Sequence, residues 1–315
     1  MGPLGTQEQR DVLEPRLDRG LLSSGRRGGG RILLAQATTS STSTATSATA
    51  AAAFDLERDV PAIMLAKGWR HGAAFQRQWF SGTAKTMDTD KKLKDTNLPV
   101  VSDLIKMDWV LSFDRAKAVY DRIIKDKVYA TPGARAEIAK TALAAHKKQK
   151  AERTGFGDLT RTGRDAYDQH VTFAGMEELH EDGTTDMDDL LASLGRFSFY
   201  AVPEGEVALA GKNYDITVKR IGVMVGDYFD FDGYQPLGWW KRPDQVRMPS
   251  KWEGIKGVGY GHLTQDDKGF TWVENASYRK FRADTGRGAD FIIFSDVKPV
   301  AVDPPLRFSV PSGSK

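Results

Sequence analysis

The feature that most constrains the fold is the stretch 221–240, where an apolar strand runs directly into aspartates, aromatic residues and glycines. Side chains of a strand alternate between its two faces, so the apolar residues at alternate positions of 221–225 share a face that would also carry Asp227. Burying an unpaired carboxylate is costly. We therefore expect either a break or bulge at Gly226 or a dedicated partner for Asp227. The dipeptide Asp232-Gly233 predicts a turn after the strand.

A second buried strand is predicted at 291–294, because four consecutive apolar residues need apolar cover on both faces. We expect this strand to be central and to lie beside the strand at 221–225. Segments with strand periodicity cover 196–202, 206–210, 214–225 and 270–273, and turn residues occupy 203–205 and 211–213. Strands joined by tight turns predict an antiparallel meander, with a bulge near Lys219-Arg220 where the apolar phase changes.

The first half of the chain reads as helical. Helices are predicted for 59–67, with Pro61 in the first turn, for 73–80, along an apolar face from 102 to 124, for 131–150 and for 185–194. A short helix or a turn is also predicted at 275–282. The predicted fold class is α+β, with a helical N-terminal half packed on a C-terminal antiparallel β-sheet.

Four regions follow from these patterns. They are a disordered low-complexity tail (1–53), a helical region (54–150), a connecting segment (151–184) and a β-rich domain (185–310). The tail is Gly/Arg-rich and then Thr/Ser/Ala-rich, with no large apolar residue to pack in its second part.

Composition excludes several classes of protein. The net charge of +3 is close to balance and gives no support for a nucleic-acid partner. Without any cysteine the chain has no thiol nucleophile, thiolate metal site or disulfide. No apolar run approaches the roughly 18 residues of a membrane span, and 32–35 is too short for the apolar core of a signal peptide. We therefore expect a protein that is cytoplasmic in the producing cell.

Five separated blocks of the sequence carry a resemblance. They read WRHGAAFQRQWFSG, IKMDWVLSFDRAKAVYD, LLASLGRFSFYAV, GDYFDFDGYQPLGWW and NASYRKFRADTGRGADFIIFSDV. In this order they are similar to the bacterial family of domains of unknown function numbered 6402, over nearly all of 54–300. The family's central motif is Asp-x-Tyr-Asp-Phe, and this chain has Phe229 in place of the tyrosine. The resemblance implies no established activity. It implies a Gram-negative source and, through some members' proximity to type VI secretion spike genes, delivery into other cells without a signal peptide.

The residues of 227–232 are the leading candidates for a site. If the protein is an enzyme, we expect Asp227, Asp230 and Asp232, together with His262 and Arg279, to support metal-assisted or acid/base-assisted hydrolysis. Asp230 and Asp232 are the candidate metal ligands, and no cofactor can be named. Two known site motifs are incomplete in this sequence. An EF-hand loop starting at Asp230 lacks its glycine and glutamate, and the lysozyme-like glycine-histidine signature at 259–264 lacks its upstream carboxylates.

The nearby arginines have a simpler interpretation. Arg279, Arg282 and Arg287 are expected to pair with Asp284 and Asp290 rather than to hold an anion.

Two functions remain open from the sequence. The first is a delivered antibacterial effector, whose partners would be a secretion spike or an immunity protein. The second is a non-enzymatic adaptor or interaction protein of the secretion system, in which Trp239, Trp240 and Trp252 form an exposed binding face.

Overall fold

A computed structural model of the protein describes residues 53–172, 178–179, 187–248 and 262–313. The chain divides into two units, Met1–Ala51 and Ala52–Lys315, and all described residues belong to the second. The tail predicted as disordered therefore lies outside the described residues, except for its last position, residue 53. In the described part, no helix combines the length and the apolar character that crossing a membrane requires.

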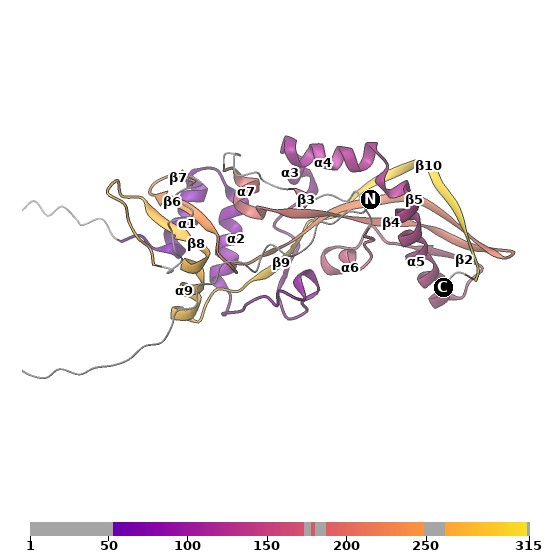
Figure 1. Ribbon diagram of the computed structural model, residues 1–315, viewed down its shortest axis with the longest axis horizontal. Helices are drawn as coiled ribbons and strands as arrows, with labels where there is room; N and C mark the ends of the chain where they lie inside the picture. The colour runs from indigo at the N-terminus through magenta and orange to yellow at the C-terminus, as the bar shows by residue number, and fades with distance from the viewer. Residues whose placement is uncertain (1–52, 173–177, 180–186, 249–261, 314–315) are drawn as a thin grey trace, which may run out of the picture. The chain divides into compact units, whose positions relative to one another are not determined.

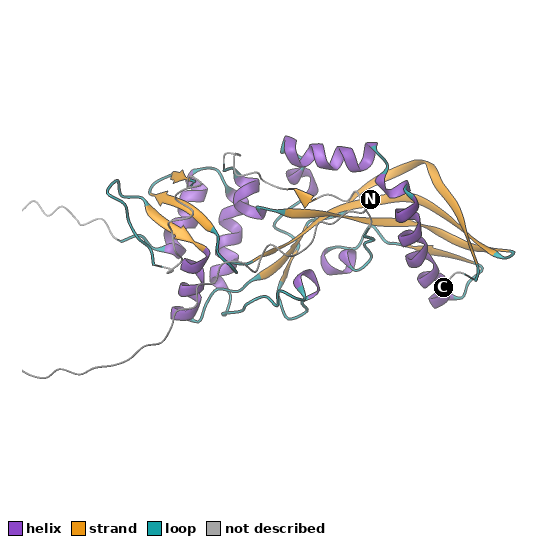
Figure 2. Cartoon of the chain, viewed as in Figure 1, coloured by secondary structure: helices purple, strands orange, loops and turns teal. Residues whose placement is uncertain are grey.

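The helices lie mostly in the N-terminal half, as predicted (Figure 1). They are α1 (Leu56–Ala66), α2 (Arg70–Ser81), α3 (Met107–Val110), α4 (Asp114–Lys125), α5 (Pro132–Gln149), α6 (Gly163–Tyr167), α7 (Asp189–Leu194) and α9 (Asn275–Thr285), with the 3-10 helices η1 (Lys92–Lys94) and η2 (Val128–Ala130). Most strands lie in the C-terminal half of the sequence, and Figure 2 shows helices and strands together in one fold, so the predicted α+β class is confirmed.

The predicted helix boundaries hold best where the cap is local. Thr131 caps α5 by accepting a hydrogen bond from the Ala134 N–H at 3.2 Å, and Pro132 occupies the first helical position. For α1 the predicted start at Asp59 is wrong. Asp55 is the cap, its carboxylate accepts from the Arg58 N–H at 2.7 Å, and Pro61 lies inside the helix.

The single helical face predicted for 102–124 is two helices. The Met107 N–H at the start of α3 donates to the distant Asp296 carboxylate at 2.7 Å. After α3 the Ser112 hydroxyl donates to the Trp109 carbonyl at 2.6 Å, and Phe113 takes an extended conformation before α4 begins. A serine hydroxyl that bonds a nearby carbonyl competes with helix continuation, so the apolar spacing persists while the helix does not.

The larger sheet is built around one long hairpin. Its strands are β1 (Val100–Val101), β2 (Arg153–Phe156), β3 (Glu178–Leu179), β4 (Phe197–Ala210), β5 (Asn213–Phe229), β9 (Phe291–Phe294) and β10 (Lys298–Pro311). The order is β1-β9-β5-β4-β2, with β10 on β5 and β3 on β4. The predicted antiparallel sheet is in fact mixed, because β1, from the helical half, pairs with β9 in parallel.

The hairpin differs from the predicted meander at one point. Residues 203–205 do not turn; β4 runs through them, and its register on β5 shifts between Glu204 and Gly205. Glu204 pairs with Arg220 and Gly205 with Val218, so Lys219 is the extra residue of the bulge, as predicted. A Cβ on Gly205 would lie 2.0 Å from the Thr217 carbonyl oxygen. The glycine therefore permits close approach of the two strands rather than a turn.

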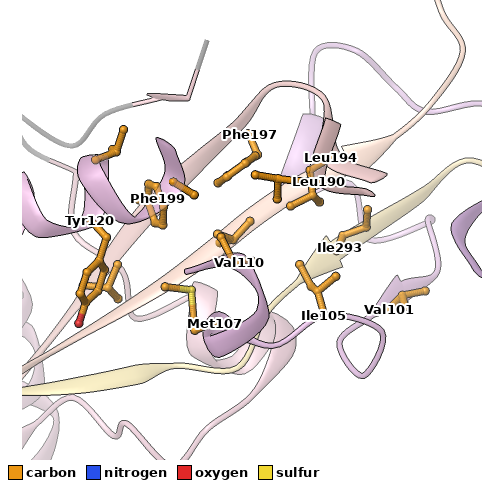
Figure 3. Close-up of a cluster of buried hydrophobic side chains, with 14 of the residues drawn as sticks. Val101, Ile105, Met107, Val110, Tyr120, Leu190, Leu194, Phe197, Phe199 and Ile293 are labelled. Atoms are coloured by element: carbon orange, nitrogen blue, oxygen red, sulfur yellow. The ribbon is translucent and has the colours of Figure 1, made fainter. Parts of the chain in front are cut away.

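Strand β9 is central and buried on both faces, as predicted. It pairs antiparallel with β5 over Gly226 to Phe229. Phe291 and Ile293 enter one apolar cluster, and Ile292 and Phe294 enter the other. Figure 3 shows part of the first cluster, in which Ile293 lies with residues of β1, α3, α4, α7 and β4.

A smaller antiparallel sheet holds the Gly-Trp-Trp sequence. Its strands are β6 (Pro236–Lys241), β7 (Gln245–Arg247) and β8 (Thr271–Glu274), in the order β7-β6-β8. The segment 151–184, predicted as a connection, also contains structure: β2 pairs with β4, and α6 contacts β4 and β9. Short elements of this kind give no clear period in the sequence.

Candidate functional site

Strand β5 carries the candidate carboxylates out of the core. It does not break at Gly226 but continues to Phe229, with Asp227 opposite Ile293 of β9. Asp227 is 8% exposed and is not without an interaction partner. Of the two alternatives for this position, continuation of the strand with a partnered Asp227 is therefore the one observed.

Asp230 is the first residue beyond the strand, and its side chain is partly buried. Its Oδ1 accepts a hydrogen bond from the Asp232 N–H at 2.8 Å. Burial raises the pKa of Asp230 from 3.8 to about 6; the nearby charges of Asp290 and Asp232 act in the same direction, while the Asp232 N–H and Arg282 oppose the rise. Asp230 therefore gains and loses its proton near neutral pH.

A buried ion pair lies next to Asp230. Asp290, at the entrance to β9, is 1% exposed and accepts from the Trp79 Nε1–H and the Met87 N–H, each at 2.9 Å. It also pairs with Arg282 of α9, whose guanidinium lies over the Trp79 ring at 5.1 Å. Arg282 donates a further hydrogen bond to the Thr86 hydroxyl at 2.6 Å. The carboxylate of Asp290 thus accepts hydrogen bonds from three donors.

The aromatic residue after Asp230 fixes the loop against this ion pair. Phe231 stacks on Tyr278 with ring centroids 3.6 Å apart and planes 6° apart, and it meets Trp79 edge-on at 5.0 Å. Phe229 packs in the same apolar layer, 5.2 Å from Phe291. Phe229 is partly buried and packs its apolar ring against the core.

Helix α9 holds the rest of the loop through backbone carbonyls. The Arg279 Nη1–H groups donate to the Phe231 carbonyl at 2.7 Å and the Gly233 carbonyl at 2.6 Å. Asn275 donates to the Asp232 carbonyl at 2.7 Å. Arg279 is therefore brought to the candidate site, but these two donors are used to position the chain.

The remaining predicted residues are not gathered in the same way. Asp232 is exposed, and it meets Asp230 and Asn275 through its backbone alone. Its N–H donates to Asp230, and its carbonyl accepts from Asn275. His262 is exposed, and within the described ranges no hydrogen bond or ion pair joins it to the aspartates. Nor do three or more acidic or histidine side chains gather there as metal ligands would. The metal site predicted at Asp230 and Asp232 stays a prediction that rests on two residues.

The arginine pairings follow the predicted simpler interpretation only in part. Arg282 pairs with Asp290, as predicted. Arg287 instead pairs with Glu57 of α1, and Asp284 pairs with Lys280. Sequence reasoning missed Trp79 and Met87 as partners of Asp290, because they lie 211 and 203 residues away in the chain.

The proposed tryptophan face is only partly exposed. Trp240 is 2% exposed and packs edge-on against Trp69, at a centroid distance of 6.5 Å. Trp239 lies on the other face of β6, 5.1 Å from Trp272 and with the Arg247 guanidinium over its ring. Trp252 lies outside the described residues. The expectation that Trp240 is exposed is wrong, because it completes the packing of β6 on the helices.

Comparison with known proteins identifies one family. The sequence profile described as "Family of unknown function (DUF6402)" matches residues 54–310. No curated protein and no solved structure matches the chain.

Proposed function

The chain belongs to the family of unknown function DUF6402, and we propose that it is a bacterial effector whose Asp230 carboxyl acts as general acid and base in a hydrolytic reaction. The observation that carries this proposal is the environment of Asp230. A carboxyl whose pKa is raised to about 6 holds its proton weakly enough to donate it and binds it strongly enough to take it back near neutral pH.

The contrast with Asp290 supports the assignment of the role to Asp230. Asp290 is buried and accepts from Trp79, Met87 and Arg282, so its carboxylate is held by the protein and is not open to a substrate. Asp230 is partly exposed, and its hydrogen bond within the described residues comes from the Asp232 N–H. Carboxyl groups whose environments differ in this way commonly divide into a structural and a chemical member.

The biological setting of the proposal comes from the family-level expectation. We propose that the protein resides in the cytoplasm of the producing cell, is delivered into other cells by type VI secretion, and has a secretion spike and an immunity protein as partners. The adaptor alternative relied on exposed tryptophans, and the burial of Trp240 removes one of the three.

The proposal is tested by growth. The whole chain is expressed in a bacterial host, directed separately to the cytoplasm and to the periplasm, as wild type, Asp230→Asn and Asp267→Asn. Asp267 is an exposed aspartate near β8 and serves as the matched charge control.

Wild type and Asp267→Asn are expected to stop growth in one compartment, whereas Asp230→Asn is expected to be folded and harmless. Growth arrest by folded Asp230→Asn, equal to that of wild type, would contradict the role of Asp230. Undisturbed growth with soluble, folded wild type in both compartments would contradict the effector proposal itself.

A further inference from the structure

A histidine and an aspartate outside the Asp230 region form a hydrogen-bonded pair. The Nδ1 of His71, the second residue of α2, lies 2.8 Å from the Oδ2 of Asp189, the first residue of α7. The Oδ1 of the same carboxylate accepts from the backbone N–H groups of His71 and Gly72, each at 3.0 Å. Because Asp189 acts as an acceptor at both oxygens, we assign the ring proton of His71 to Nδ1. The Nε2 atom of the neutral ring then carries a lone pair.

The surrounding packing fixes the orientation of this imidazole. Trp109 of α3 stacks on the ring, with centroids 3.9 Å apart and planes 27° apart. Gly72 lets α2 come close to α7, because a Cβ at this position would lie 3.1 Å from a side chain of α7, and Figure 1 shows the two helices side by side. The neighbouring carboxylate of Asp188 is bound by Arg115 at 2.7 and 2.8 Å. His71 is therefore held by Asp189 in one defined geometry.

The second ring nitrogen of His71 is available for chemistry. The side chain is 29% exposed, and its Nε2 has no hydrogen-bond partner in the described part of the chain. A neutral imidazole nitrogen with a free lone pair is both a base and a nucleophile. Among the described residues, no hydroxyl or amine side chain bonds to this atom. The imidazole itself is therefore the group that can attack an electrophile.

We propose that His71 is a nucleophilic residue that accepts acyl groups from activated esters and anhydrides, and that Asp189 is its positioning residue. The Nε2 lone pair forms a bond to the acyl carbon, and the bond from that carbon to the leaving oxygen breaks. The Nδ1 proton of the acylated ring moves to Asp189, which keeps the ring neutral. This inference is independent of the role proposed for Asp230.

Water completes the reaction and restores the imidazole. Its oxygen bonds to the acyl carbon, and the bond between that carbon and Nε2 breaks, so that the carboxylic acid leaves. One proton of the water returns the ring to its Nδ1–H form, and the proton held by Asp189 is released to solvent. The net reaction is hydrolysis of the acyl donor.

The nucleophilic role is tested by acylating the full chain with diethyl pyrocarbonate, an anhydride that reacts with neutral imidazoles, followed by peptide mass spectrometry. His146 is the matched control. It is also partly exposed and lies 5.1 Å from an aromatic ring, that of Tyr214, but its partner within the described ranges is the Thr154 hydroxyl rather than a carboxylate. We expect His71 to be acylated several times faster than His146. Equal rates, or faster acylation of His146, would overturn the nucleophilic role.

Asp189→Asn tests the positioning role. The asparagine NH₂ group can donate to Nδ1, which places the ring proton on Nε2 and removes the lone pair there. Acylation of His71 should then slow by about tenfold or more, while acylation of His146 should not change. An unchanged rate at His71 would contradict the role of Asp189.

Loss of the fold in Asp189→Asn would be recognised, because it would change the acylation rates of both histidines. Nitrogen-15 spectra of the wild-type imidazole of His71 at pH 8 decide the point without any variant. Nδ1 should carry the proton and Nε2 should not, and the opposite assignment would contradict the proposed geometry.

Acyl transfer itself is tested with p-nitrophenyl acetate as the acyl donor. Wild type and His146→Gln should release p-nitrophenolate at equal rates, and His71→Gln should release it several times more slowly. A rate for His71→Gln equal to that of wild type would overturn the acyl-transfer proposal, whatever growth assays show for Asp230→Asn.

Discussion

Replacing Asp230 by asparagine should stabilise the protein at alkaline pH. The folded state raises the pKa of Asp230 from 3.8 to about 6, so it binds the proton more tightly than the unfolded chain does. Stability is therefore highest, as far as this group is concerned, below pH 3.8, and it falls as the pH rises to about 6. Above that window the ionised carboxylate carries the full penalty.

The size of the change in the free energy of unfolding follows from the raised pKa of Asp230. A difference of about 2 pKa units corresponds to roughly 3 kcal/mol at about 1.4 kcal/mol per unit. Because Asp230 is partly exposed, water reduces this figure, and we expect about 1–3 kcal/mol. Asparagine stays neutral at all pH values, and its amide oxygen can keep the hydrogen bond from the Asp232 N–H.

The assay is urea unfolding of wild type, Asp230→Asn and Asp267→Asn at pH 8 and at pH 4.5. Asp230→Asn should be more stable than wild type at pH 8, and the gap should shrink by more than half at pH 4.5. Asp267→Asn should match wild type at both. A gap that is absent at pH 8, or that does not depend on pH, would refute the reasoning about Asp230.

Three further predictions concern the buried ion pair of Asp290, the glycine beside Trp79, and His170. Asp290→Ala should destabilise the protein by about 3–5 kcal/mol in urea unfolding, because it leaves Arg282 buried without its partner. Asp284→Ala, at an exposed ion pair, should cost less than about 1 kcal/mol, and equal losses would contradict the importance of the buried Asp290–Arg282 pair. Gly288→Ala should lower the melting temperature more than Gly286→Ala. Both glycines have positive φ, so both substitutions strain the backbone. A Cβ at 288 would also lie 2.4 Å from the Trp79 ring, whereas a Cβ at 286 would meet nothing within 4 Å. Burial lowers the pKa of His170 below 6.5, so the stability that this residue contributes is present above pH 6.5 and is lost on acidification. His170→Gln should therefore weaken the fall in the free energy of unfolding between pH 7 and pH 5. An equal fall in wild type and His170→Gln would contradict this prediction.

Local signals in the sequence predicted the parts of the fold that are locally determined. Thr131 and Pro132 start α5 with their own cap, as predicted. The run 291–294 predicted a central strand from its composition alone. In these cases the physical cause lies within a few residues of its effect.

Features that depend on residues far apart in the sequence were not predicted. The carboxylate of Asp189 accepts from the first N–H groups of α2, 117 and 118 residues earlier, so the predicted start of that helix at Ala73 was three residues late. Likewise the shape of β4 depends on Gly205 approaching Thr217 across the hairpin. A turn residue and a bulge residue look alike until the partner strand is known.

The candidate site shows the same division. Asp230 and the pairing of Arg282 with Asp290 were within reach of the sequence, since the pair is eight residues apart. Burial raises the pKa of Asp230, and no local pattern in the sequence reveals that burial.

The most direct test of the account is the carbon-13 titration of the Asp230 side-chain carboxyl in the full chain, assigned by comparison with Asp230→Asn. The account predicts a midpoint near pH 6. A midpoint at or below 3.8, the ordinary value for aspartate, would contradict both the burial argument and the acid/base role built on it.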